Sequence, residues 1–196
     1  MQKKITLADF FIKNASKDKF VLEIETGKKK NYIKILEAAK KISSYKKINK
    51  GDIVTVILPN SIDFIECFLA SLLGGWIFNP LPYFIQDQEI EKIFDYVRPK
   101  LIITNKKQIF EKFCNNYKII SPKEIILTKK VYTFRKINPN HPAALYYSSG
   151  TTGNPKGVLY SHDNMTSLIR SIVKGFKFKR KDNQLAFLPF GHTASI

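Results

Sequence analysis

The sequence predicts an α/β fold in which a largely parallel sheet is flanked by helices. Short runs rich in β-branched residues, such as "IVTVIL" at 53–58, alternate with segments whose apolar residues recur at helical spacing. A glycine-rich stretch, "SSGTTGNPKG" at 148–157, directly follows one apolar run. Because parallel sheets bind ligands at the carboxyl ends of their strands, this stretch is the main candidate for a binding site.

The elements of the first half follow from local patterns. Apolar residues at helical spacing predict a helix over 32–47, and the turn "KGD" leads into the strand at 53–58. Pro59 ends that strand, and we expect Asn60 to cap the next helix, which reaches Gly74. Further along we expect strands at 76–80, 101–104 and 117–121, a helix capped by Asp87 that stops before Pro99, and a helix at 106–116.

Segment 122–141 is polar, charged and flanked by prolines, which is typical of a connector. We therefore expect residues 1–125 to form a first α/β subdomain and residues 126–196 to begin a second one that carries the glycine-rich loop. In this second part the patterns predict strands at 143–149, 157–162 and 183–189, and a helix at 163–176.

Composition excludes several classes of protein. Cys67 and Cys114 lie far apart without a CxxC or a neighbouring histidine, so no zinc site or disulfide framework is evident, and a reducing cytoplasm fits. The net charge of +17 attracts polyanions, but its lysines are scattered and no nucleic-acid motif accompanies them. The uncharged run at 68–85 is broken by glycines and prolines, so we expect no membrane span. The N-terminus "MQKKITLADFFIKN" has a basic start but no uninterrupted apolar segment, so we expect no export signal.

The loop at 148–157 has the composition of a phosphate-binding site. Glycines let backbone N–H groups approach an anion, four hydroxyls can donate hydrogen bonds, and Lys156 adds a full charge. The kinase-type phosphate loop does not match, since there the lysine lies between Gly and Ser or Thr, and no GxSxG hydrolase turn is present. A structural turn rich in hydroxyls is the alternative.

Three segments carry a family resemblance. "YYSSGTTGNPKGVLYSH" closely resembles the phosphate-binding signature of the adenylate-forming superfamily, which includes acyl- and aryl-CoA ligases and firefly luciferase. The stretch from "NYIKIL" to "NPLPY" looks like the first conserved region of that family, and "LPFGHTASI" resembles the segment that ends in a substrate-site histidine. The resemblance runs roughly from Tyr32 to Ile196, and the double serine is closer to CoA ligases than to peptide-synthetase adenylation domains.

The resemblance implies activation of a small-molecule carboxylic acid by ATP to an acyl adenylate and then a coenzyme A thioester, with Mg²⁺ required. By this resemblance Lys156 and His192 are the catalytic residues, and His192 borders the acyl and adenylate site. The ATP phosphates would be held by Ser148, Ser149, Gly150, Thr151, Thr152, Gly153, Asn154, Pro155, Lys156 and Gly157. His162 follows the loop as in the family and is expected to be structural; we expect no metal-binding residue.

The resemblance also implies an incomplete N-terminal part of the family's large domain. Nothing here resembles the family's adenine motif, its "TGD" region or its C-terminal lysine. We therefore expect a fragment, a truncated product or half of a split enzyme, inactive unless a complementing C-terminal chain is supplied. A non-catalytic module that binds anions or nucleotides is the alternative function.

Overall fold

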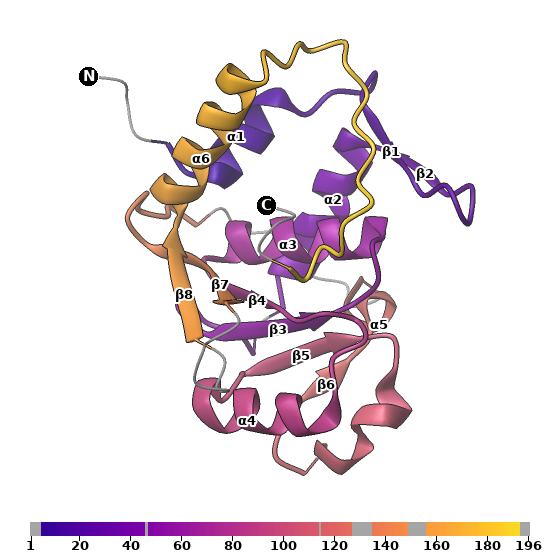
Figure 1. Ribbon diagram of the computed structural model, residues 1–196, viewed down its shortest axis with the longest axis vertical. Helices are drawn as coiled ribbons and strands as arrows, with labels where there is room; N and C mark the ends of the chain where they lie inside the picture. The colour runs from indigo at the N-terminus through magenta and orange to yellow at the C-terminus, as the bar shows by residue number, and fades with distance from the viewer. Residues whose placement is uncertain (1–4, 46, 114, 127–134, 149–155, 193–196) are drawn as a thin grey trace.

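A six-stranded sheet is the centre of the computed structural model shown in Figure 1, which describes residues 5–45, 47–113, 115–126, 135–148 and 156–192. Its strand order is β6-β5-β3-β4-β7-β8. All neighbours pair in parallel except β7 and β8, so the predicted α/β fold with a largely parallel sheet is confirmed. The strands are β3 (Ile53–Ile57), β4 (Ile77–Pro80), β5 (Leu101–Thr104), β6 (Ile119–Ile120), β7 (Pro142–Ser148) and β8 (Lys156–Ser161).

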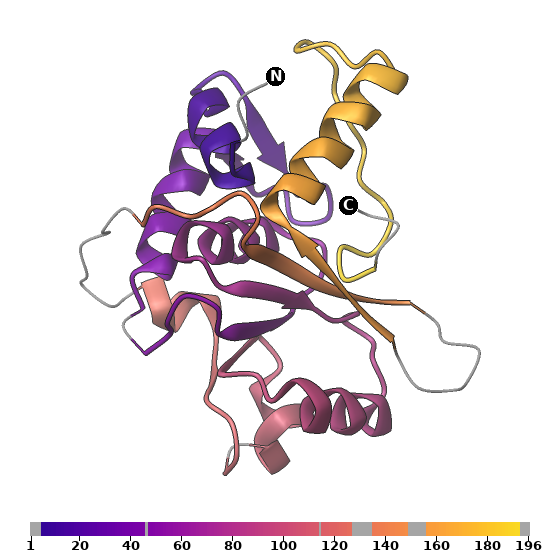
Figure 2. The same ribbon diagram turned by 90° about the vertical axis from the view of Figure 1, so that its left-hand side faces the viewer.

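Helices cover both faces of this sheet (Figures 1 and 2). One face packs against α2 (Tyr32–Ser43) and α3 (Ile62–Gly74). α1 (Leu7–Asn14) contacts α3, and α5 (Pro122–Ile126) contacts α2. The other face packs against α4 (Asp87–Val97) and the 3₁₀ helix η1 (Lys107–Phe113). α6 (His162–Gly175) lies beside α1, and a small hairpin, β1 (Phe20–Leu22) with β2 (Lys29–Asn31), lies next to α2.

The core has two parts because side chains alternate along the strands. Leu101 and Ile103 of β5 belong to the cluster under α2 and α3, whereas Ile102 belongs to the cluster under α4. Each of these three side chains is fully buried. The continuous apolar runs of the sequence therefore mark strands covered on both faces.

The end of α3 lies where the sequence placed it. Gly75 has φ +68°, in the left-handed region that glycine adopts without steric cost, and its N–H donates to the Ser71 carbonyl. The Trp76 N–H donates to the same carbonyl over 2.9 Å, and Trp76 is fully buried. Residues 68–80 of the uncharged run thus span the end of α3 and all of β4 and are mostly buried, whereas Phe84 beyond β4 is exposed. None of the helices in the described part of the chain has the length and apolar character needed to cross a bilayer.

Several local predictions were wrong. Ser61, not Asn60, caps α3, since its side chain accepts from the Phe64 N–H. Gln86 precedes α4, so Asp87 is the first helical residue instead of the cap. Residues 106–116 contain a 3₁₀ helix in place of an α-helix, and residues 183–189 form no strand. α1, the β1–β2 hairpin and α5 had not been expected.

The helix predicted over 32–47 ends earlier, at Ser43. The hydroxyls of Ser43 and Ser44 both donate to the Lys40 carbonyl, over 2.9 and 2.8 Å, and so compete with the helical hydrogen bonds. The division at residue 125 stays a prediction. β7, which follows it, pairs with β4, which precedes it.

Candidate functional site

The two ends of the glycine-rich loop are held together at one edge of the sheet. The antiparallel register places Ser148 opposite Lys156 and Tyr147 opposite Gly157. Opposite residues of such a pair have Cα atoms about 4.5–5.5 Å apart. The remaining predicted loop residues lie outside the described residues, and their part in the site stays a prediction: Ser149, Gly150, Thr151, Thr152, Gly153, Asn154 and Pro155.

The packing of β7 determines where Ser148 lies. Ala143 and Ala144 are fully buried, and Ala144 pairs in parallel with Phe78 of β4. β7 therefore ends, at Ser148, on the carboxyl edge of the parallel strands, where α/β sheets bind ligands. Ser148 and Lys156 are exposed, so a hydroxyl and an ammonium group are available side by side at that edge.

Gly157 is exposed on β8 and lies beside side chains of β7. A Cβ atom at this glycine would lie 3.0 Å from the side-chain atom Cδ1 of Leu145. Burial raises the pKa of the neighbouring Tyr146 and Tyr147 hydroxyls well above their ordinary value. Both phenols are therefore neutral near pH 7, and neither supplies a negative charge that would compete with an anion for Lys156.

His192 lies on a segment without helix or strand that is fixed to the same edge of the sheet. Asn60, which follows β3, donates from Nδ2 to the Leu188 carbonyl and accepts from the Phe190 N–H, both over 2.7 Å. His192 is exposed, and its N–H donates to the Pro189 carbonyl over 3.0 Å. The sequence did not reveal this role of Asn60. A polar side chain directly after a buried strand was the available signal.

The other two histidines lie away from this edge. His162 is the first residue of α6 and is fully buried, and neither ring nitrogen has a hydrogen-bond partner among the described residues. Burial lowers the pKa of His162 to about 4, so its ring is neutral, in agreement with the structural role expected. The Nε2 atom of His141 lies 3.0 Å from the Gly75 carbonyl.

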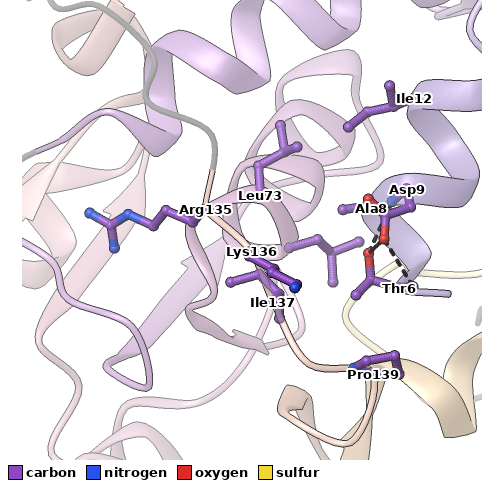
Figure 3. A pocket seen from close by; sticks show the side chains of 10 residues that line it. Thr6, Ala8, Asp9, Ile12, Leu73, Arg135, Lys136, Ile137 and Pro139 are labelled. Atoms are coloured by element: carbon purple, nitrogen blue, oxygen red, sulfur yellow. Dashed lines mark hydrogen bonds between the residues drawn. The ribbon is translucent and has the colours of Figure 1, made fainter. Parts of the chain in front are cut away.

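A cleft of about 340 Å³ lies at the opposite, amino edge of the sheet (Figure 3). It is lined by Leu72 and Leu73 from the end of α3, and by Arg135 and Lys136 from the segment before β7. Its acidic group, Asp9, already accepts from Thr6 in the capping box of α1. A second cleft, about 660 Å³, lies beside the starts of β5 and β6 and is lined by Arg98, Lys100 and Lys118 among others.

Neither cleft contains a predicted catalytic or phosphate-binding residue. Ser148, Lys156 and His192 lie instead at the carboxyl edge and are exposed. In the described ranges no group of three or more His, Cys, Asp or Glu side chains could hold a metal ion. At the carboxyl edge the described residues Ser148 and Lys156 offer a hydroxyl and an ammonium group.

Comparison with known proteins identifies the family. The model of the family "AMP-binding enzyme" matches residues 12–196. The chain belongs to the AMP-binding enzyme family. Among curated members, 4-coumarate–CoA ligases 3 and 4 of Arabidopsis thaliana are 28% and 30% identical, each over 76% of this chain. Vanchrobactin synthetase VabF of Vibrio anguillarum is 27% identical over 156 residues.

Solved structures share the fold of this chain. ATP-bound MatB from Rhodopseudomonas palustris superposes with a TM-score of 0.84 at 21% identity, and covers 97% of this chain. McyG A-PCP complexed with phenylalanyl-adenylate has the same TM-score at 23% identity, over 100% of this chain. The chain spans about 30% of the length of the plant ligases and 34–42% of these two structures. It therefore corresponds to part of an AMP-binding enzyme.

Proposed function

We propose that this chain forms the phosphate-binding part of an enzyme that uses ATP to activate a carboxylic acid for transfer to coenzyme A. The observation that carries the proposal is the placement of Ser148 opposite Lys156 at the carboxyl edge of the sheet, in a chain of the AMP-binding family. The names of relatives support the same class of reaction. They are 4-coumarate–CoA ligases, and the neighbouring structures hold ATP or an aminoacyl adenylate.

In the first proposed step a carboxylate oxygen attacks the α-phosphorus of ATP. The bond from that phosphorus to the oxygen bridging to the β-phosphate breaks, and pyrophosphate leaves with the negative charge. Lys156 and the N–H and hydroxyl donors of residues 148–157 would stabilise this charge. At an effective dielectric constant of about 20, one charge pair in contact is worth ~4 kcal/mol before desolvation.

In the second step the thiol sulfur of coenzyme A attacks the acyl carbon, AMP leaves, and the thiol proton passes to solvent. His192 would border the acyl group and the adenylate, which its exposed position on the same edge supports. Magnesium takes most of its ligands from phosphates and water, so it would enter with ATP. The absence of a three-residue metal cluster in the described ranges is compatible with such binding.

The remaining two thirds of the family's length would supply the rest of the enzyme, as a continuation of the same chain or as a separate complementing chain. A cytoplasmic location belongs to the same proposal, since the buried Cys67 thiol is free. The alternative is a module that binds anions or nucleotides without turnover. The net charge of +17 favours it, because such a surface attracts polyanions at no particular site.

Pyrophosphate exchange separates the two functions. The chain joined to, or mixed with, the remaining part of a family member should incorporate labelled pyrophosphate into ATP only when a suitable carboxylic acid is present. A panel of aryl, fatty and amino acids tests the substrate class. Binding of ATP without exchange for any acid would leave the non-catalytic module as the function.

A further inference from the structure

We propose that Asn60 and Gly191 are positioning residues for His192. Together they lock the segment Leu188–His192 onto the carboxyl ends of β3 and β4. The consequence for catalysis rests on the proposed function, whereas the lock itself rests on contacts between described residues.

The Asn60 carboxamide forms a two-point clamp. Its Nδ2 donates to the Leu188 carbonyl over 2.7 Å, and its Oδ1 accepts from the Phe190 N–H over 2.7 Å. One carboxamide offers both a donor and an acceptor, so it pairs with the backbone of residues two apart as a neighbouring strand would. Among short side chains only this carboxamide carries a donor and an acceptor on one carbon near pH 7, and the clamp joins positions about 130 residues apart.

The Phe190 side chain adds an apolar anchor to this segment, two residues before His192. Its ring centroid lies 5.3 Å from that of Phe64 on α3, and Phe64 in turn contacts Phe78 of β4. Upstream, Leu185 and Phe187 are 67% and 78% exposed. The segment is therefore held at its end, next to His192, and is largely exposed to solvent before that.

Gly191 brings the backbone into close contact with the residues that directly follow β4. A Cβ atom here would lie 2.6 Å from the carbonyl carbon and oxygen of Leu81 and 2.8 Å from the Pro82 nitrogen. These are backbone atoms, and Leu81 is fully buried, so they cannot yield as a flexible side chain would. Only glycine allows the peptide before His192 to lie against this edge.

The lock sets the position of His192 relative to the phosphate site. β4 lies between β3, which leads to Asn60, and β7, which leads to Ser148. A segment that is fixed to the ends of β3 and β4 thus keeps a constant position relative to Ser148. Without the lock, His192 would be carried by a stretch that has neither helix nor strand after α6.

Nuclear magnetic resonance of the chain without ligand tests the lock. In Asn60→Ala the Phe190 amide should exchange with solvent about tenfold faster, which corresponds to the loss of one hydrogen bond. The backbone order parameter of His192 should fall from about 0.85 to below about 0.6. The Val56 amide, in the centre of β3, and the unfolding midpoint should not change. Asn60→Asp keeps an acceptor, so the Phe190 amide should remain protected.

Asn105→Ala is the matched control, since Asn105 is an exposed asparagine just after β5 on the same edge. This variant should leave the amide exchange rate of Phe190 and the backbone order parameter of His192 as in the wild type. Unchanged exchange at Phe190 or an unchanged order parameter at His192 in Asn60→Ala would overturn the proposal. So would a uniform loss of protection through α3 and β3, which a merely structural role predicts. Failure of pyrophosphate exchange would refute the proposed function alone, because the lock is measured without it.

Discussion

Replacement of Lys156 by methionine tests the phosphate site most directly. Methionine keeps the unbranched apolar stem and removes the charge. Lys156 is the first residue of β8, is exposed, and lies opposite Ser148, so a phosphate bound at the end of β7 can reach its ammonium group. A hydrogen bond to a charged group contributes about 1.5–3 kcal/mol. Lys156→Met should therefore weaken tripolyphosphate or ATP binding about ten- to a hundredfold.

Stability should change little in this variant. An exposed side chain away from the core typically alters the free energy of unfolding by about 0.5 kcal/mol or less. Isothermal titration calorimetry with tripolyphosphate, at two salt concentrations, measures the affinity, and urea unfolding measures stability. Long-range attraction to the surface charge falls strongly above 0.1 M salt, where the screening length is about 10 Å. A contact to Lys156 is screened less.

Lys41→Met is the matched control, because Lys41 is an exposed lysine on α2, outside the β7–β8 hairpin. It removes the same charge from the same total of +17. If attraction to the whole surface explains binding, the two variants should lose affinity equally. Equal losses of affinity would refute a phosphate site at Lys156 and would favour the alternative that the loop is a structural turn.

Three further predictions concern the fold that supports the site. Burial lowers the pKa of His162 to about 4, so below pH 6.5 the folded state binds fewer protons than the unfolded state. The contribution of the neutral ring to the free energy of unfolding is complete above pH 6.5. It falls by up to about 3 kcal/mol as the pH falls toward 4. Urea unfolding at pH 7 and 4.5 should show a smaller pH dependence in His162→Phe, and an identical dependence would contradict the assignment. Lys30 pairs with the buried Glu66, whose pKa is raised by burial. Lys30→Met should therefore lower the free energy of unfolding by about 3 kcal/mol, and the double variant Lys30→Met/Glu66→Leu should recover most of this loss. Equal stabilities of the single and double variants would count against the pair. Gly191→Ala should speed chymotryptic cleavage at Phe190, whereas Gly175→Ala, where a Cβ meets nothing within 4 Å, should not; equal cleavage rates would show that the close approach is not required.

Strand and helix predictions succeeded where local pattern and packing agree. The run "IVTVIL" forms β3, since burial on both faces requires the apolar character that the run displays. Predictions failed where a neighbour in space decides the outcome. Residues 183–189 are as apolar as some strands, but Leu185 and Phe187 stay exposed and the segment forms no strand. An apolar run becomes a strand only when another strand is available to pair with it.

By itself, the sequence determined the α/β class, the family resemblance and the residues of the glycine-rich loop, because periodicity and turn chemistry act over a few neighbouring residues. The tertiary structure decided that the Ser148–Lys156 pair lies at the carboxyl edge of the parallel strands, since β7 pairs in parallel with β4. It also decided that Asn60 clamps the segment before His192 instead of capping α3. Asparagine suits both roles equally well, and only the approach of a chain segment about 130 residues away distinguishes them.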